Sequence, residues 1–200
     1  MQLDFYFFRH GQTDYNVQGV WQGSGTNAVL NATGERQAYE LASKFIVFGF
    51  TRLYCSPMLR AVQTADAISR YNSNMPITIL QDLRECSFGE CEGVTSEEVL
   101  AKFGREAVDE FLYPTKDNWD MRFPGGESKH EVFARVYNCL NGILASLSKD
   151  EHHCIGIVCH AGVLSALQCG FDLKDVSYDN CAVWHLSYNT DTREWTQVFD

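Results

Sequence analysis

The chain has 200 residues, of which 45% are hydrophobic and 21% are charged, and its formal net charge at pH 7 is −10. This length suits one well-packed domain, and the hydrophobic content excludes a disordered chain. The negative balance argues against nucleic acid or an anionic membrane as a partner, because both require a basic field.

The apolar runs are too short and too interrupted by charge to cross a bilayer. Near the N-terminus, Asp4 interrupts the first run and Arg9 ends it, which does not fit a secretory signal. We therefore expect a cytoplasmic protein with a small ligand, and we expect no membrane partner.

The eight cysteines fall largely within apolar segments, and a chain of this size does not need disulfides to hold its core. We expect them to be reduced. The spacings Cys86-x4-Cys91 and Cys154-x4-Cys159 differ from those of the usual zinc sites. The sequence therefore predicts no metal site.

Short β-branched or aromatic runs alternate along the chain with segments of helical period. The first strand is expected at Leu3–Phe8, followed by a loop and a helix that begins near Gly34 and ends at Gly49. Residues Arg52–Cys55 form the next predicted strand, and Ser56-Pro57 turns the chain into a second helix.

Two capping boxes, Thr95-x-x-Glu98 and Ser128-x-x-Glu131, predict helix starts, the second that of a long helix. The run Ile77–Leu80 is too short to be assigned as a strand from its pattern alone. Further strands are expected at 154–159, typical of a strand buried on both faces, and at 182–188 and 195–199. The alternation predicts an α/β fold, a three-layer α/β/α sandwich with a mostly parallel central sheet, in a single domain over residues 1–200.

Charged and imidazole side chains follow several of these strands where each strand ends. Arg9-His10 comes directly after the first strand, Arg60 lies near the start of the second helix, and His160 ends the 154–159 run. Because the carboxyl ends of parallel strands share one edge, we expect these side chains and Glu85 to meet there. Guanidinium groups hold phosphate, and imidazole is a competent nucleophile, so the grouping predicts chemistry at phosphorus.

Each of these residues also has a structural explanation when it is taken alone. Arg60 could be a solvated helix residue, Glu85 could pair with the adjacent Arg84, and His160 could be a satisfied core histidine. The functional interpretation therefore depends on the other motifs in the chain.

These motifs, in their order and spacing, resemble the histidine phosphatase superfamily, in the branch of cofactor-dependent phosphoglycerate mutases and their phosphatase relatives. No single motif is decisive, but together they span nearly the whole chain. The matching motifs are Arg9-His10-Gly11-Gln12-Thr13 with Asn16, Gln22-Gly23, Gly34-Glu35-Arg36-Gln37-Ala38, Ser56-Pro57 with Arg60-Ala61-x-Gln63-Thr64-Ala65, Leu83-Arg84-Glu85 with Gly89 and Glu92-Gly93, Pro124-Gly125-Gly126-Glu127-Ser128, and His160.

The resemblance implies a role for each site residue. His10 would attack the phosphoryl group to form a phosphohistidine, with its other ring nitrogen held by a backbone carbonyl. Glu85 would protonate the leaving oxygen and then help to deprotonate water. No metal and no cofactor are implied. The groups that would surround the phosphoryl oxygens are Arg9, Asn16, Arg60, His160 and the amide of Ala161.

The resemblance leaves three functions open. Mutases of this family carry a long insertion after the general acid, with further arginines. Here about forty residues separate Glu85 from Gly125, and they contain Arg105 and Arg122 but no Arg-Arg pair. We therefore favour hydrolysis over mutase-type phosphoryl transfer, with a non-catalytic phosphate-binding module as the third alternative.

The segment of about residues 86–126 is dense in aromatic side chains and is expected to form a small cap. Its aromatics either contact an apolar or ring-bearing substrate or pack the cap on the domain. Trp21, Gln22 and Gly23 are further candidates for substrate contact. A sugar phosphate, a nucleotide-like metabolite and a phosphorylated acid all remain possible substrates, and a homodimer is a possible assembly.

Overall fold

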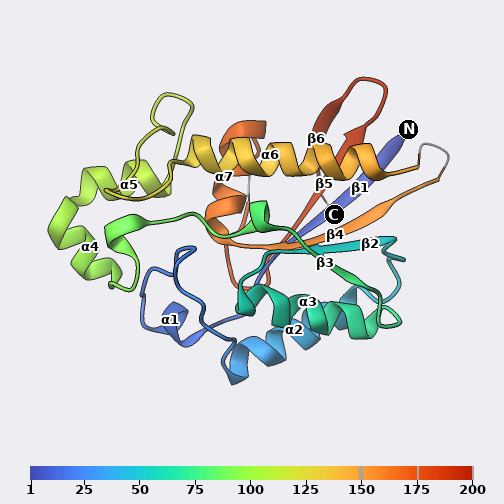
Figure 1. The fold of residues 1–200 in the computed structure, drawn as a ribbon, viewed down its shortest axis with the longest axis horizontal. Coiled ribbons are helices and arrows are strands. Elements are labelled where there is room, and N and C mark those ends of the chain that lie inside the picture. The colour runs from blue at the N-terminus through green and yellow to red at the C-terminus, as the bar shows by residue number, and fades with distance from the viewer. Residues whose placement is uncertain (149–150, 175, 200) are drawn as a thin grey trace.

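A computed structural model describes residues 1–148, 151–174 and 176–199. Its centre is a six-stranded sheet with the order β3-β2-β4-β1-β5-β6 (Figure 1). The pairings among β1 to β4 are parallel, whereas β5 and β6 run antiparallel to their neighbours, which confirms the predicted mostly parallel sheet. The strands are β1 (Gln2–Arg9), β2 (Arg52–Cys55), β3 (Ile77–Ile79), β4 (Cys154–Cys159), β5 (Val183–Asn189) and β6 (Glu194–Val198).

The register of the sheet aligns the ends of three strands. Arg9 at the end of β1 lies opposite Cys159 of β4, and Cys55 of β2 lies opposite Val158. The pairing of β1 with β4 continues one residue further, since the N–H of His10 donates to the carbonyl of Cys159 at 3.1 Å. The residues that follow β1, β2 and β4 are therefore neighbours at one edge of the sheet.

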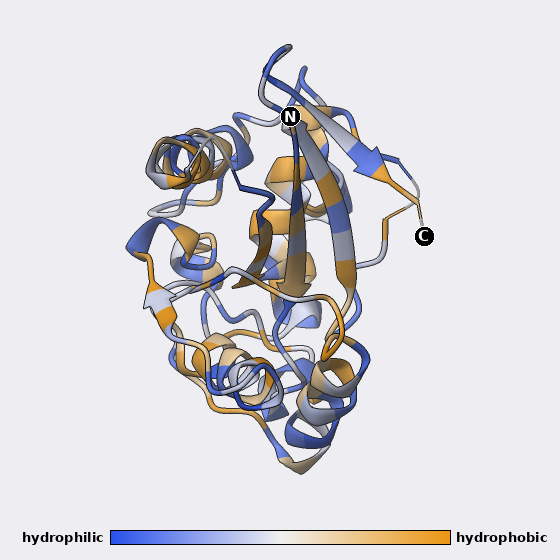
Figure 2. Ribbon diagram, turned by 90° about the vertical axis from the view of Figure 1, so that its right-hand side faces the viewer, coloured by the Kyte–Doolittle hydropathy of each residue, from blue (hydrophilic) through white to orange (hydrophobic). Residues whose placement is uncertain are grey.

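Helices cover both faces of the sheet because β1 is apolar on both sides. Phe5 and Phe7 belong to the core beneath α6 (Lys129–Ser146) and α7 (Ala161–Phe171). On the opposite face, Tyr6 and Phe8 belong to a second core formed with α2 (Ala32–Lys44) and α3 (Leu59–Tyr71). Figure 1 shows α6 on one side of the sheet and α2 and α3 on the other, and Figure 2 shows the mainly hydrophobic strands between them.

Both predicted capping boxes are confirmed. Thr95 caps α4 (Ser96–Phe103), and Ser128 caps α6 with its hydroxyl accepting from the N–H of Glu131 at 3.2 Å. In return, the Glu131 carboxylate accepts from the N–H of Ser128 at 2.9 Å. The paired hydrogen bonds fix the start of α6 beside the end of the sheet.

The predicted end of the first long helix was wrong. Helix α2 ends at Lys44 rather than at Gly49, because the backbone leaves the helical conformation at Phe45 and continues as a turn, and the Phe45 ring packs on the Phe8 ring with the centroids 5.0 Å apart. Helix α3 begins at Leu59, two residues beyond Pro57.

The remaining short elements are α1 (Asp14–Val17), α5 (Arg105–Leu112) and the 3-10 turns Gln81–Leu83 and Gly89–Cys91. Helices α4 and α5 lie together at one end of the molecule, at the left of Figure 1. Their buried residues Val99 and Phe111 join the same hydrophobic core as β1 and α6. Among the described helices, none has the length and apolar character needed to cross a membrane.

Candidate active site

His10 lies directly after β1 and is 3% exposed. Its Nδ1–H donates to the carbonyl oxygen of Gly11 at 2.7 Å, which fixes the tautomer and leaves the lone pair on Nε2. Gly11 has no room for a side chain, because a Cβ atom there would lie 2.5 Å from the carbonyl oxygen of Gly34. Burial lowers the pKa of His10 well below 6.5, and the charges of Arg9 and Arg60 lower it further. The ring is therefore neutral at neutral pH, which is the nucleophilic form.

His160 follows β4 and packs beside His10, with the ring centroids 5.2 Å apart. Its Nε2 lies 2.6 Å from the hydroxyl oxygen of Ser56, the residue that follows β2. Burial, and then the charge of Arg60, lower the pKa of His160 well below 6.5. Its Nδ1 is buried and has no hydrogen-bond partner among the described residues.

The two arginines flank this histidine pair. Arg60 is fully buried, and its terminal nitrogens donate to the carbonyls of Thr26 at 2.8 Å and Gln22 at 3.2 Å. Arg9 donates through Nη1 to the carbonyl of Tyr178. Burial lowers the pKa of each guanidinium, while the negative charge of Glu85 raises it.

The Nε–H groups of Arg9 and Arg60 are buried, and like Nδ1 of His160 they lack a partner within the described parts of the chain. Leaving such polar groups unsatisfied costs about 1–3 kcal/mol each, and more for charged groups. Both arginines also act electrostatically on both histidines, so positive charge and unsatisfied polar groups gather around the two rings. Such a grouping can bind an oxyanion, as is typical of sites that stabilise a transferring phosphoryl group.

Glu85 supplies a carboxylate to the same site and is 4% exposed. One of its oxygens accepts from the N–H of Cys86 at 2.7 Å, and the other accepts from the N–H of Gly162 at 3.2 Å. Gly162 is the second residue of α7, so the positive end of that helix faces the carboxylate. Glu85 and His10 line one cavity.

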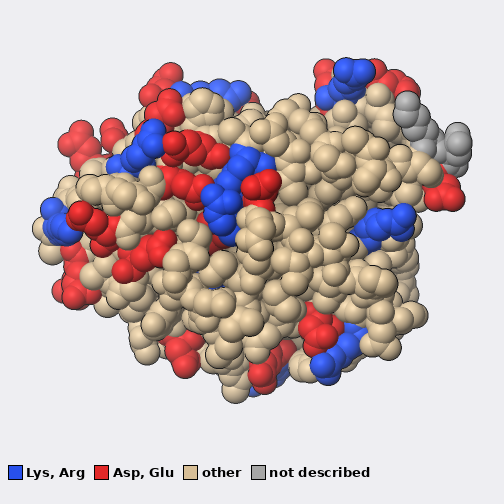
Figure 3. All heavy atoms as spheres, in the orientation of Figure 1, with Lys and Arg blue, Asp and Glu red and all other residues tan. Residues whose placement is uncertain are grey.

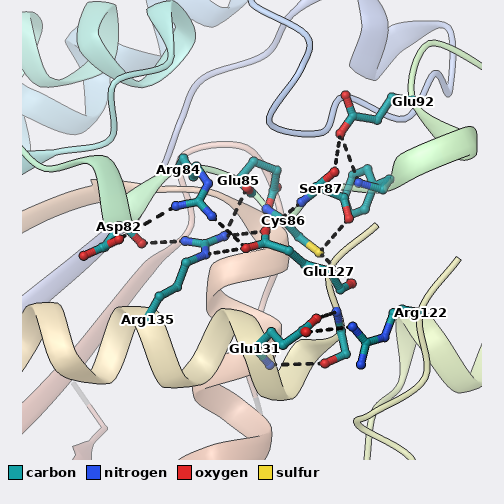
Figure 4. A network of polar contacts seen from close by, with 12 residues as sticks. Asp82, Arg84, Glu85, Cys86, Ser87, Glu92, Arg122, Glu127, Glu131 and Arg135 are labelled. Atoms are coloured by element: carbon teal, nitrogen blue, oxygen red, sulfur yellow. Dashed lines mark hydrogen bonds and ion pairs between the residues drawn. The ribbon is translucent and has the colours of Figure 1, made fainter. Parts of the chain in front are cut away.

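A partly buried ion-pair network holds the backbone around Glu85 (Figure 4). Arg135 of α6 donates to the carbonyls of Glu85, at 3.1 Å, and Asp82. It also donates to the Glu127 carboxylate, which in turn accepts from the N–H of Ser87 at 2.9 Å. Burial raises the pKa of Glu127, but the hydrogen bonds and charge of Arg135 outweigh it, so the net shift is downward. The network thus ties the chain down on both sides of Glu85.

Two further groups complete the polar end of the site. The Oδ1 atom of Asn16 accepts from the N–H of Thr13 at 3.0 Å and from Nδ2 of Asn180 at 3.2 Å, which leaves the Asn16 amide nitrogen as a donor. Asn180 also donates to the carbonyl of His10 at 3.1 Å. Ala161 is the first residue of α7, so its N–H has no acceptor within the helix. Asn16 and Ala161 both line the cavity.

The cavity has a volume of about 340 Å³ and two chemically different ends. Arg9, His10 and Glu85 lie at the polar end. The remainder of the wall is mostly apolar or aromatic and comes largely from the loop after His10 and from the segment around α5. Its lining residues include Val20, Trp21, Phe88, Phe111, Leu112, Tyr113 and Lys129.

The predicted substrate-contact residues divide into two groups. Trp21 and Gln22 line the cavity. Gly23 does not, and it has no room for a side chain, because a Cβ atom there would lie 2.0 Å from Oε1 of Glu92. Arg60 and His160 are fully buried and do not belong to the described cavity lining, although the His160 ring packs beside that of His10.

The aromatic residues of segment 86–126 also divide. Phe88, Phe111 and Tyr113 line the cavity, whereas Phe123 is buried in the core and Trp119 stacks on His130. The structure thus places some of these aromatic side chains at the cavity and others in the core or at the surface.

Three participants were missed by sequence reasoning. Ser56 was treated as a turn residue, although its position before Pro57 in a family motif was a usable signal. Asn180 lies in a loop with no recognisable pattern. Lys129 directly follows the predicted cap residue Ser128 and lines the cavity.

The cysteines and histidines form no cluster of three or more potential metal ligands within the described residues. All eight thiols are free, as expected. Cys86 and Cys159 are buried beneath the site, and burial raises the pKa of both.

Comparison with known proteins places this geometry in a family. The model of the histidine phosphatase superfamily (branch 1) matches residues 5–200. An uncharacterized phosphatase of Bacillus subtilis (strain 168), PhoE, is 36% identical over 124 residues, which are 60% of this chain and 61% of PhoE, so the match spans less than two thirds of that relative.

Solved structures share the whole fold. The mycobacterial glucosyl-3-phosphoglycerate phosphatase superposes with a TM-score of 0.85 at 22% identity, over 98% of this chain and 97% of that one. The phosphoglycerate mutase of Bacillus anthracis str. Sterne superposes with a TM-score of 0.87 at 21% identity, over 100% and 92% of the two chains. The predicted phosphoglycerate mutase-like fold is thus confirmed. Because the family model matches nearly the entire sequence, the chain belongs to the histidine phosphatase superfamily.

Proposed function

We propose that this protein is a metal-independent phosphatase that hydrolyses a small phosphomonoester through a phosphohistidine on His10. One observation carries the proposal: a buried neutral His10, with Nδ1 bound to the Gly11 carbonyl, lies beside His160 and in the field of two arginines, and the Nε–H groups of these arginines and Nδ1 of His160 are buried without a partner among the described residues. The phosphatase name of the Bacillus relative supports the same reaction class.

In the first step, Nε2 of His10 attacks phosphorus in line with the ester oxygen. A P–N bond forms while the P–O bond to the leaving group breaks. Glu85 in its acid form gives its proton to the departing oxygen, a contribution of about 10²- to 10⁴-fold in rate. Arg9, Arg60 and His160 stabilise the charge on the phosphoryl oxygens, which replaces the role of a metal.

In the second step, water attacks the phosphohistidine. The Glu85 carboxylate accepts a proton from this water as the new P–O bond forms, and the P–N bond breaks with its electron pair returning to Nε2. Phosphate leaves, and the site returns to a neutral His10 and a protonated Glu85. The hydrogen bond from Nδ1 to Gly11 holds the ring in place throughout.

The placement of the arginines in segment 86–126 supports hydrolysis over mutase chemistry. Arg105 is 74% exposed and lies near Asp109 at the surface, while Arg122 is 48% exposed and pairs with Glu131. Neither belongs to the described cavity wall. We further propose that residues 1–200 form one domain in which segment 86–126, with α4 and α5, is a small cap over the site.

The test is hydrolysis of p-nitrophenyl phosphate in excess chelator. We expect steady turnover by the wild-type protein and a loss of at least about 10³-fold in kcat for His10→Ala. The matched control is His152→Ala, since His152 is 66% exposed and lies on the protein surface. Both variants should retain the wild-type circular dichroism spectrum.

Three results would contradict the proposal. Turnover by His10→Ala at the wild-type rate would show that His10 is not the nucleophile. Vanadate binding without turnover of any phosphomonoester would favour the non-catalytic binding module. Movement of phosphate between the carbons of 3-phosphoglycerate, stimulated by the bisphosphate and faster than its release, would favour the mutase.

A further inference from the structure

Lys129 is a buried cation in the cavity that the proposed chemistry does not use. It is the first residue of α6 and is 3% exposed. Its ammonium nitrogen lies 4.2 Å from the ring centroid of Phe111 and 5.8 Å from that of Phe88. All three residues line the cavity, so the ammonium group lies at its aromatic end.

Within the described parts of the chain, the ammonium group of Lys129 has no acidic partner. It lies over these two aromatic rings and forms neither an ion pair nor a hydrogen bond with any described residue. Glu85 lines the same cavity, but its oxygens accept from the N–H groups of Cys86 and Gly162. Lysine is almost never buried without a partner, because the ion loses its hydration.

The position of Lys129 on its helix is also unfavourable. The N-terminus of α6 carries partial positive charge, which stabilises acidic side chains and disfavours a lysine in the first turn. The faces of Phe88 and Phe111 compensate in part through cation–π attraction. Lys129 is thus a buried cation without a counter-ion and also lies at the unfavourable end of a helix. Such a residue inside a cavity is typical of a functional site, where a ligand supplies the missing partner.

Other cations near this wall are already neutralised. Arg84 and Arg135 both donate to the Glu127 carboxylate. Arg122 pairs with Glu131 outside the cavity. The cavity therefore presents Arg9 at the reacting end and Lys129 at the aromatic end.

We propose that Lys129 binds a second anionic group, a carboxylate or a second phosphate, on the leaving-group portion of the substrate. This inference rests on the proposed phosphatase function and names its substrate class: a small phosphomonoester that carries a further negative charge. The aromatic wall excludes water around the ammonium group, which strengthens its attraction for that charge.

The test uses substrate pairs that differ in one anionic group. The three-carbon pair is 3-phosphoglycerate against glycerol 3-phosphate, and the six-carbon pair is 6-phosphogluconate against sorbitol 6-phosphate. A third pair, fructose 1,6-bisphosphate against fructose 6-phosphate, distinguishes a second phosphate from a carboxylate. We expect Lys129→Met to lower kcat/KM for the charged member of at least one pair by about 10- to 100-fold, the size of a charged hydrogen bond. The kcat/KM for the member that lacks the second anionic group should change by less than about 3-fold.

Two controls separate recognition from structure. Lys129→Arg keeps the charge and should retain most of the preference for the charged member. Lys102→Met removes an exposed lysine of α4 that pairs with Glu90. It should leave the ratio of kcat/KM values within each substrate pair unchanged. The methionine variant should be folded, since its side chain can pack against the same rings.

Equal effects of Lys129→Met on both members of all three pairs would overturn this inference while leaving the phosphatase proposal intact. An absence of turnover of p-nitrophenyl phosphate and of every pair by the wild-type protein would instead refute the proposed function itself.

Discussion

The chemical state of individual side chains determines what this site can do. The sequence places Arg9 beside His10, but adjacency does not reveal whether the imidazole is charged. The structure supplies that information, because His10 is 3% exposed and lies within the fields of Arg9 and Arg60. A ring that stays neutral is ready to attack phosphorus at the pH of the cell.

This protonation state can be measured directly by NMR titration of the His10 imidazole. Burial, and then the charges of Arg9 and Arg60, lower its pKa, so the ring should gain its proton well below pH 6.5. In Arg60→Met, loss of one positive charge should raise the pKa of His10. Arg70→Met, on the exposed face of the same helix, is the matched control and should leave it unchanged. Protonation of His10 at or above pH 6.5 in the wild-type protein would contradict this account.

At the scale of single elements, the sequence predicted a helix or strand most reliably where one face of that element is exposed. The capping boxes of α4 and α6 were predicted correctly, because the Thr95/Glu98 and Ser128/Glu131 pairs satisfy helix ends by local hydrogen bonds. Helix α7 was not predicted, since it is buried nearly all round and its apolar sequence lacks a helical period. Helix α5 follows Gly104, which offers no side-chain cap.

The packing of α7 against Glu85 leads to a paired glycine test. In Gly162→Ala, the new Cβ atom would lie 2.3 Å from Oε1 of Glu85, so the carboxyl group must move. We expect kcat for alkyl phosphates to fall by at least about 10-fold, with a smaller loss for aryl phosphates, which need less help from an acid.

The control is Gly142→Ala on α6, where nothing lies within 4 Å of the added atom. It should raise the free energy of unfolding by about 1 kcal/mol and leave kcat unchanged. If both alanine variants had full activity on alkyl phosphates, Glu85 would not be held in place by α7.

At the scale of the whole molecule, the alternation of short apolar runs with segments of helical period along the chain was sufficient to predict the α/β class and the mostly parallel sheet. The edge at which the site forms followed from that topology. Two details of the site could not be predicted in this way. Glu92 packs so closely against Gly23 that no side chain fits there, and Lys129 of α6 lies over the ring of Phe111 of α5. Such contacts join residues that are far apart in the sequence, so local sequence patterns do not predict them.

Charge is distributed unevenly over the molecule. Acidic side chains crowd the end formed by α4 and α5 in Figure 3, in keeping with the net charge of −10. Arg9 and Arg60, in contrast, lie inside, where few water molecules screen them. Under the proposed function, this local positive charge would attract an anionic substrate against the overall repulsion.

The free thiols provide a test of the packed interior. Burial raises the pKa of Cys86, Cys154 and Cys181 to about 12. In the native protein at pH 8, these three thiols should thus react with iodoacetamide about 10³-fold more slowly than a free cysteine, and the protein should keep its activity. In urea, mass spectrometry should show alkylation of all eight cysteines. Rapid labelling of the native protein, with loss of activity, would show that the interior is more open than described.

The central claim is that Nε2 of His10 carries the phosphoryl group. The most direct measurement is alkaline quenching of Glu85→Gln during turnover of p-nitrophenyl phosphate, since hydrolysis of the phosphoenzyme should be slow in this variant. The account predicts one phosphoryl group per chain, attached to Nε2 of His10, because Nδ1 is bound to the carbonyl of Gly11. A phosphoryl group on Nδ1 or on another residue, or none at all while turnover continues, would contradict it.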